Sequence, residues 1–244
     1  MNLYANFSFL FSALKSHKLC GATEDGFLYL AEAHLGYTPR GPLHFGGGYY
    51  LRNGTTFQDP VLAAAGREFP IPLLVSLFTR DTIVKLPPLD ERKNPREMVN
   101  EVLRAGFSKE HGVTFGFSIE VGAKRIRRES FERRKAPAVA RGRREDGAQT
   151  TKALYTLHRL ALSSATEHTD EDCEMVAMLP FNHILSLTHY FTLELKRSGL
   201  TGVLGDRWAL MVVTTALGLY YLRQIGRTGK ATVGAAQAIH GKQA

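Results

Sequence analysis

The sequence predicts an α+β protein in three parts: a mixed α/β domain in residues 1–123, a basic Arg-rich loop or insert in residues 124–149, and a helical domain in residues 150–244. Three observations lead to this prediction. Apolar residues alternate with small or polar ones over residues 113–121, which is the period of a strand with one buried face. A dense run of basic residues follows, and beyond it apolar residues recur at helical spacing.

Three helices are predicted in the first part of the chain. Residues 3–15 place five apolar side chains at helical spacing, as in an amphipathic helix. Residues 59–66 combine an Asp at the N-cap position, a Pro in the first turn and a Gly at the end, which are the usual signals for a short helix. A third helix is expected over residues 94–105. Short apolar segments lie between them, at residues 27–35, 69–78 and 82–86.

About four helices are predicted in the last part, which would pack as a bundle. Residues 151–162 carry an apolar stripe, the sequence TDED at residues 169–172 caps a short helix, and Asn182 caps another that ends at Gly199. Asp206 caps the last and most apolar helix, which extends to residue 225. Its uncharged run is shorter than the roughly 20 residues that cross a bilayer, so we expect a buried core helix and no membrane association.

The basic stretch between these parts holds the net charge of the chain. Residues 124–144 contain ten basic residues and two acids, a local balance of +8. Because the whole chain is also +8, the remaining residues sum to about zero. The ten basic residues are Lys124, Arg125, Arg127, Arg128, Arg133, Arg134, Lys135, Arg141, Arg143 and Arg144.

Clustered guanidinium groups gain from displacing counterions on a phosphate backbone, and their planar fork suits phosphate oxygens. We therefore expect these ten side chains to bind nucleic acid, with Arg40 and Arg52 of a Gly-rich loop in support. Two other interpretations stay open: a solvated, disordered basic linker, and a basic contact with another protein.

The sequence shows no signature of a cofactor or metal site. Residues 46–48 are three consecutive glycines, which could cradle a phosphate or form a surface turn, but neither GxxxxGK[ST] nor GxGxxG is present. HExxH is absent, and Cys20 and Cys173 lie too far apart to suggest a zinc site or a disulfide framework. We expect no cofactor, no metal and, since the N-terminal residues lack a signal-peptide pattern, a cytoplasmic protein.

Short motifs resemble the small version of the large subunit of type IV CRISPR effector complexes. They read HKLCGA at residues 17–22, TTFQDPVLA at 55–63 and FSKEH at 107–111, followed by a strand, an Arg-rich middle and a helical C-terminal part. That family carries a Cys-rich, zinc-finger-like element near its N-terminus. Here only Cys20 is present, and FPIPL occupies residues 69–73, so the resemblance implies that zinc has been lost.

The resemblance implies a non-catalytic subunit of a guide-RNA ribonucleoprotein. Such a subunit would contact guide RNA and the duplex DNA beside the target, and would touch other protein subunits of the complex. Two alternatives of other classes stay open. One is a metal-independent ribonuclease that processes guide RNA, in which His44 acts beside Arg40 and Arg52. The other is a coat-like assembly protein whose basic arm neutralises packaged nucleic acid.

Overall fold

The computed structural model describes residues 1–6, 16–34, 46–67, 81–89, 97–122, 127–136, 153–160, 173–182 and 188–240. These residues contain thirteen strands in one sheet and two α-helices. The strands are β1 (Asn2–Ala5), β2 (Ser16–Cys20), β3 (Phe27–His34), β4 (Gly48–Arg52), β5 (Val61–Gly66), β6 (Asp81–Leu86), β7 (Val99–Ser108), β8 (Gly112–Val121), β9 (Arg127–Lys135), β10 (Leu154–Arg159), β11 (Glu174–Pro180), β12 (His189–Thr192) and β13 (Glu194–Leu195). The helices are the 3-10 helix η3 (Arg197–Gly199), α2 (Asp206–Gln224) and α3 (Lys230–His240).

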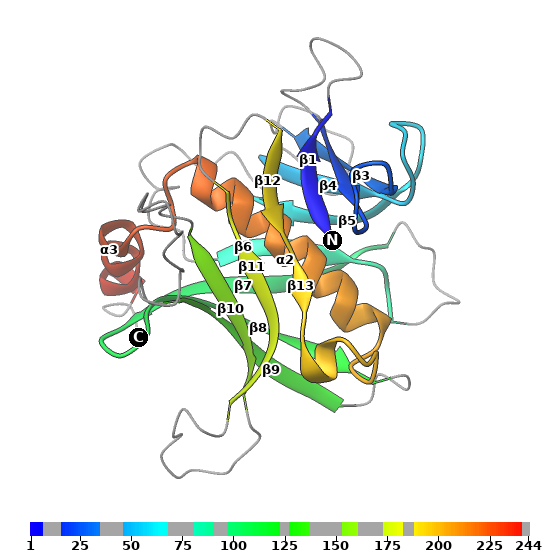
Figure 1. The fold of residues 1–244 in the computed structure, drawn as a ribbon. Coiled ribbons are helices and arrows are strands. Elements are labelled where there is room, and N and C mark those ends of the chain that lie inside the picture. Colours follow the sequence, from blue (N-terminus) through cyan, green and yellow to red (C-terminus); the bar gives the residue numbers. More distant parts are fainter. Residues whose placement is uncertain are drawn as a thin grey trace, which may run out of the picture.

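Strands β1 to β11 form an antiparallel meander, in which each strand pairs with the next one along the chain. At one edge of the sheet β12 pairs with β1, and at the other edge β13 pairs with β11. A further bridge joins Phe181, just after β11, to Phe191 in β12. The segment that carries β12 and β13 therefore brings the two edges together, and the sheet curls into a nearly closed barrel (Figure 1).

Helix α2 runs through the interior of this barrel and forms the centre of its core. Every residue from Thr214 to Tyr220 is buried, so the helix is covered on all sides at this level. It packs against β4, β5, β6 and β8. Trp208 stacks obliquely on Phe131 of β9, and Tyr220 meets the rings of Phe181 and Phe191 on the opposite wall. Burial of such apolar surface is the dominant stabilising term of the fold.

The predicted α+β class with a helical C-terminal bundle is wrong, because the described residues are mostly antiparallel strands. Residues 59–66 illustrate the reason for the error, because they carry the sequence signals of a helix but contain the strand β5. Ala63, Ala64 and Ala65 are completely buried. Ala63 and Ala65 belong to the core cluster that contains α2, while Ala64 packs with Tyr50 in a second cluster. The small size of Ala65 lets α2 come close, since a Cβ built on Gly218 would lie 3.2 Å from the Ala65 Cβ. Ala65 is explained by this close packing rather than by its helix propensity.

The other predicted helices that overlap the described residues, apart from the last, also contain strands. Residues 3–15 include most of β1, with residues 7–15 outside the described part, and residues 94–105 include most of β7. Residues 151–162 contain β10, where Tyr155 and Leu157 are the buried residues that face the core. The segments expected as helices before Pro180 and after Asn182 contain β11, β12 and β13. Such short apolar runs fit a helix or a strand equally well, and the segments that pack against them in the fold determine which structure they adopt.

Two predicted elements are confirmed. The alternating residues 113–121 form β8, whose residues Val113, Phe115, Phe117 and Ile119 point into the core. The last apolar run forms α2 as a core helix. Among the described helices, none combines the length and apolar character needed to traverse a lipid bilayer.

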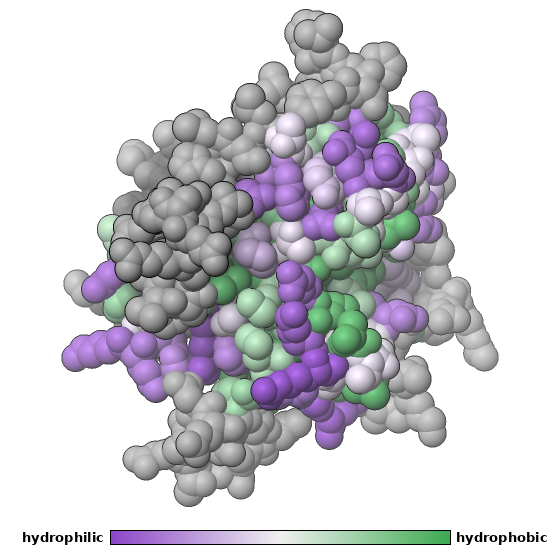
Figure 2. Space-filling model, viewed as in Figure 1, coloured by the Kyte–Doolittle hydropathy of each residue, from purple (hydrophilic) through white to green (hydrophobic). Residues whose placement is uncertain are grey.

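An apolar groove of about 830 Å³ opens beside the N-terminal half of α2. Its floor is formed by Ala209, Leu210 and Val213 of the helix, and its walls come from β3 to β5 on one side and from β13 on the other. Figure 2 shows apolar residues gathered on one face of the molecule, and Leu200, which lines the groove, is exposed. A surface that binds a polyanion needs cationic side chains. Because this groove is apolar, we do not assign it to the nucleic-acid contact surface.

Candidate functional site

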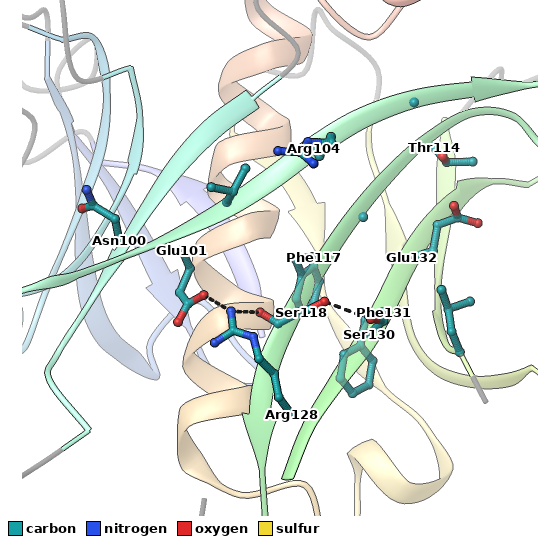
Figure 3. Close-up of a pocket in the computed structure, with 14 residues that line it drawn as sticks. Asn100, Glu101, Arg104, Thr114, Phe117, Ser118, Arg128, Ser130, Phe131 and Glu132 are labelled. Carbon is teal, nitrogen blue, oxygen red and sulfur yellow. Dashed lines mark hydrogen bonds and ion pairs between the residues drawn. The ribbon is translucent and has the colours of Figure 1, made fainter. Parts of the chain in front are cut away.

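A fork between β7 and β8 forms a polar cavity on the outer face of the barrel. The two strands pair only between Arg104–Gly116 and Ser108–Gly112. Beyond Arg104 and Gly116 both strands continue but diverge (Figure 3). The cavity of about 570 Å³ that lies there is bordered by β7, β8 and β9 and includes Arg128, one of the predicted nucleic-acid contacts.

Arg128 belongs to a network of four charges at this fork. Its guanidinium pairs with the carboxylates of Glu101 in β7 and Glu120 in β8, and it donates to the Ser118 carbonyl at 2.9 Å. From inside the barrel, Arg207 of α2 pairs with the same two carboxylates, at 3.1 Å to Glu101 and 3.0 Å to Glu120. Arg207 also donates to the Pro87 carbonyl at 2.6 Å. The network joins the diverging strands to each other and to the central helix.

The electrostatics of this network favour the paired state. Burial raises the pKa of Glu120, but a backbone hydrogen bond and the two guanidinium groups outweigh it, so the net pKa lies below the ordinary value. The charges of the two guanidinium groups and the two carboxylates sum to zero. The side chains of Glu101 and Arg207 are each only 5% exposed. To bind a phosphate, Arg128 would have to leave a buried carboxylate, which is costly. The four charges at the fork therefore compensate one another and stabilise the packing of β7, β8 and α2, and they do not form a cationic surface.

Arg127 is held in a second network at the same end of β9. Its guanidinium, 61% exposed, pairs with the carboxylate of Glu129, which is 1% exposed. Arg159 of β10 binds the same carboxylate from the other side at 2.6 Å, and also meets Glu174 at 3.4 Å. Glu174 accepts from the backbone and hydroxyl of Ser198 at 3.0 and 2.8 Å. This network ties β9, β10 and β11 to η3.

Arg133 lies inside the barrel and is completely buried. It points at α2, where it donates to the Val212 carbonyl at 2.8 Å and to the Thr215 hydroxyl at 3.2 Å. Its Nε and Nη1 have no hydrogen-bond partner in the described part of the chain. Burial lowers the pKa of Arg133 to about 9, so it is still charged at neutral pH. It cannot reach a polymer outside the barrel and is not part of the contact surface.

We expect Arg133→Met to raise the free energy of unfolding at pH 7 by about 1 to 3 kcal/mol, because a buried charge that has no carboxylate partner among the described residues is replaced by an apolar side chain of similar length. Equilibrium urea unfolding measures the change. Arg134→Met is the matched control, since that neighbour lies on the other face of β9 and pairs with Glu132 at 2.8 Å. A loss of stability in Arg133→Met would show that Arg133 has a favourable electrostatic partner.

The remaining predicted contacts divide into described and undescribed residues. Arg52 pairs with Glu32 and donates to the Asp59 carbonyl at 2.8 Å, so its charge is already compensated. Lys135, at the end of β9, is exposed and forms no ion pair with any residue that the structure describes. Six predicted contacts lie outside the described residues: Lys124, Arg125, Arg141, Arg143, Arg144 and Arg40. His44, which the alternative ribonuclease interpretation would need, also lies outside them.

Sequence reasoning missed a group of cations at one end of the barrel, which we call the basic rim. The strand registers place the end of β5, the β7–β8 turn and the end of β9 at this same end. The C-terminal end of α2 also lies there, because the Tyr49 hydroxyl at the start of β4 donates to Gln224 at 3.2 Å. The described cations of the rim are Arg67, Lys109, Lys135, Arg223, Arg227 and Lys230.

Few carboxylates oppose this rim among the described residues. At the same end Asp81 is paired with Arg104 at 2.9 Å, and Glu110 lies 3.8 Å from His111. Arg223 sits over the ring of Phe181 at 4.9 Å, and burial lowers its pKa. A sequence signal did exist: Arg223 lies in the last turn of the helix predicted to end at residue 225, where cations are favoured by the helix dipole, and Arg227 follows two residues after it.

Within the described residues, no group of three or more His, Cys, Asp and Glu side chains is placed to hold a metal ion. Both cysteines are free thiols. Comparison with protein-family models, with curated proteins and with solved structures finds no match for this chain.

Proposed function

We propose that this chain is a non-catalytic nucleic-acid-binding protein that uses the basic rim of its barrel. The observation that carries the proposal is the gathering of six cations at one end of the barrel, among them the exposed Lys135 and Lys230. The exposed Lys135 is the point where the Arg-rich stretch leaves β9 for the connection that contains Arg141, Arg143 and Arg144. A phosphate backbone is the partner that such a concentration of charge favours.

The proposed partner is guide RNA or duplex DNA in the cytoplasm, within a ribonucleoprotein that contains other protein subunits. This context comes from the resemblance to the type IV CRISPR large subunit. Some of the layout behind that resemblance differs from the structure, because the chain begins with β1 and its C-terminal part contains β10 to β13. Nucleic-acid binding therefore rests on the charge distribution, and the ribonucleoprotein context on the short motifs alone.

We expect wild-type protein to bind a short DNA duplex or RNA hairpin with an affinity that falls steeply between 50 and 200 mM salt, by roughly 10- to 1000-fold for a handful of phosphate contacts. The variant Lys135→Glu/Lys230→Glu, in which both residues are exposed, should bind at least ~10-fold more weakly and with a shallower salt dependence, because repulsion replaces two phosphate contacts. Fluorescence anisotropy measures both quantities.

The matched control is Lys18→Glu/Lys196→Glu, which changes the net charge by the same amount away from the rim. Lys18 lies within β2, and Lys196 lies at the opposite end, beside η3. We expect its affinity to stay within about twofold of wild type after long-range charge is screened. Equal losses in the two variants would mean that net charge alone drives binding, and no binding to either probe at low salt would refute the proposal.

A further inference from the structure

The central helix α2 is covered on all sides in its second half, but one stripe of its first half is open. This stripe consists of Ala209, Leu210 and Val213, which lie on one face of the helix. They are only partly buried and form the floor of the apolar groove of about 830 Å³. Leu200 at the edge of the groove is 72% exposed. Apolar surface gathered in this way is typical of a site that binds another molecule.

The strand β13 forms one wall of the groove and is the last strand of the sheet, so it pairs on one side only, with β11. Lys196 donates its backbone N–H to the Val176 carbonyl at 2.8 Å, and Leu195, one residue before it, lies opposite Ala177. Successive residues of an antiparallel strand direct their backbone groups to opposite sides. The N–H and C=O of Leu195 therefore point away from β11.

The backbone of Leu193 shows what kind of partner fits on that side. Leu193 is two residues before Leu195 and points in the same direction. Its N–H donates to the Met1 carbonyl at 2.6 Å, and its carbonyl accepts from the Met1 amine at 2.7 Å. Such an exchange of two hydrogen bonds between residues directly opposite each other is characteristic of an antiparallel pair. At Leu195 the next rung of that ladder is open, because no described strand pairs with this side of β13.

A backbone donor and a backbone acceptor beside an apolar floor match one residue of an extended peptide. Directly opposite residues of an antiparallel pair project their side chains to the same face of the sheet. The Leu195 side chain packs against the core, so a residue bonded to Leu195 would also direct its side chain toward α2. A hydrocarbon ligand would fill the groove but leave the N–H and C=O of Leu195 without partners, which is costly once water is excluded.

The charged side chains of β13 and its flank do not require a charged ligand. Glu194 and Lys196 pair with each other at 2.8 Å. The groove therefore favours a peptide strand whose alternate residues are apolar and uncharged.

We propose that the groove binds an extended segment of a partner protein, which lies antiparallel to β13 and covers the open stripe of α2. Alternate residues of this segment are apolar and pack on Ala209, Leu210 and Val213. Because β13 contains only two residues, its backbone supplies few hydrogen bonds, and the affinity depends largely on these apolar contacts. The groove lies beside the N-terminal half of α2, whereas the basic rim lies at its C-terminal end, so this inference does not depend on the proposed function.

The first test leaves the protein unchanged and compares synthetic peptides. The parent peptide is Lys-Val-Thr-Val-Thr-Val-Thr-Lys with blocked ends and a fluorescent label, and fluorescence anisotropy should show that it binds. N-methylation of all its valine amides should weaken binding by at least ~10-fold, because the residues that face the core direct their N–H groups toward Leu195. N-methylation of all its threonine amides is the matched control and should change the affinity by less than about threefold, since these N–H groups point away from β13.

Two outcomes would overturn the inference. If both modifications weakened binding equally, the peptide would not be held as a strand on the free side of β13. If the parent peptide did not bind at a concentration of ~1 mM, the groove would not accept a strand with any useful affinity.

The second test fills the groove. Ala209→Phe places a large side chain on its floor and should reduce the affinity for the parent peptide by at least ~10-fold through steric exclusion. The matched control is Ala231→Phe, the same substitution at an exposed residue of α3, which should bind like wild type. Undiminished binding by a folded Ala209→Phe protein would overturn the site, and if this variant does not fold, the methylated peptides decide.

The two proposals can fail separately. Lys135→Glu/Lys230→Glu should bind the peptide like wild type. Wild-type protein that bound the peptide but no nucleic acid would refute the proposed function and keep the groove site, and the reverse result would refute the groove site alone.

Discussion

Arg207→Met is expected to lower the free energy of unfolding by about 3 to 5 kcal/mol, which is the usual effect of removing one partner from a buried ion pair. The substitution leaves Glu101, 5% exposed, with its charge in the barrel wall and only the half-exposed Arg128 to meet it. It also removes the bond from the helix to the Pro87 carbonyl. Equilibrium urea unfolding at pH 7 measures the loss.

The double variant Arg207→Met/Glu101→Gln should recover part of this loss, because the uncompensated carboxylate is removed together with its partner. Arg104→Met is the control: its pair with Asp81 is at the surface and contributes only about 0 to 1 kcal/mol. If Arg207→Met cost no more than Arg104→Met, the charge network would not be what holds the fork between β7 and β8 to the central helix.

The same network shows why the site could not be predicted from the Arg-rich stretch alone. Residues 127–135 alternate between the two faces of β9, so Arg133 turns inward and Arg128 outward. Their partners are far away in the sequence: Glu101 is separated from Arg207 by 106 residues, and Arg133 from Thr215 by 82. Charge counted along the chain does not reveal such pairs. The basic rim is likewise invisible in the charge count, because its cations come from β5, the β7–β8 turn, β9 and the end of α2, which the fold brings to one end of the barrel.

The fold was predictable where one element carries a long, unambiguous pattern. The strict alternation in β8 and the extended apolar run of α2 each permit one interpretation. The strands β5, β7 and β10 do not, because the apolar residues of each suit either period. In addition, β5 and β10 have only six residues each. What decides them is the position of α2 inside the sheet. A helix covered on all sides needs a wall of strands around it, a requirement that local sequence does not express.

Acid should destabilise the protein through His17 between about pH 6.5 and 4. This ring is 4% exposed and lies among Tyr49, Tyr190 and Tyr220. Burial lowers its pKa from 6.5 to about 4, against the opposing effect of the Ser16 carbonyl. In this window the unfolded chain binds a proton that the folded chain does not, so stability falls as the pH falls. The total loss is about 3 kcal/mol, at roughly 1.4 kcal/mol for each unit of pKa difference.

The hydrogen bonds of the neutral His17 ring explain why its protonation is unfavourable in the folded protein. Nδ1 lies 2.8 Å from the Ser16 carbonyl, which can only accept, so Nδ1 carries the proton. Nε2 lies 3.0 Å from the Tyr49 hydroxyl, whose single proton is shared between this nitrogen and the Gln224 side-chain oxygen at 3.2 Å. Protonation would place a second N–H against that hydroxyl, in a pocket whose tyrosines supply no negative charge in acid because burial raises the pKa of Tyr49, Tyr190 and Tyr220 further still.

His17→Gln removes the titrating group, so its unfolding free energy should stay nearly level from pH 6.5 to 4.5, whatever its value at pH 7. Carboxylates with lowered pKa values, such as Glu120, Glu129 and Glu174, lose their contribution only as the pH falls below about 4.5, so they do not obscure this window. His111→Gln, in the β7–β8 turn, is the control and should retain the wild-type slope. Identical slopes in wild type and His17→Gln would show that His17 does not carry the acid sensitivity.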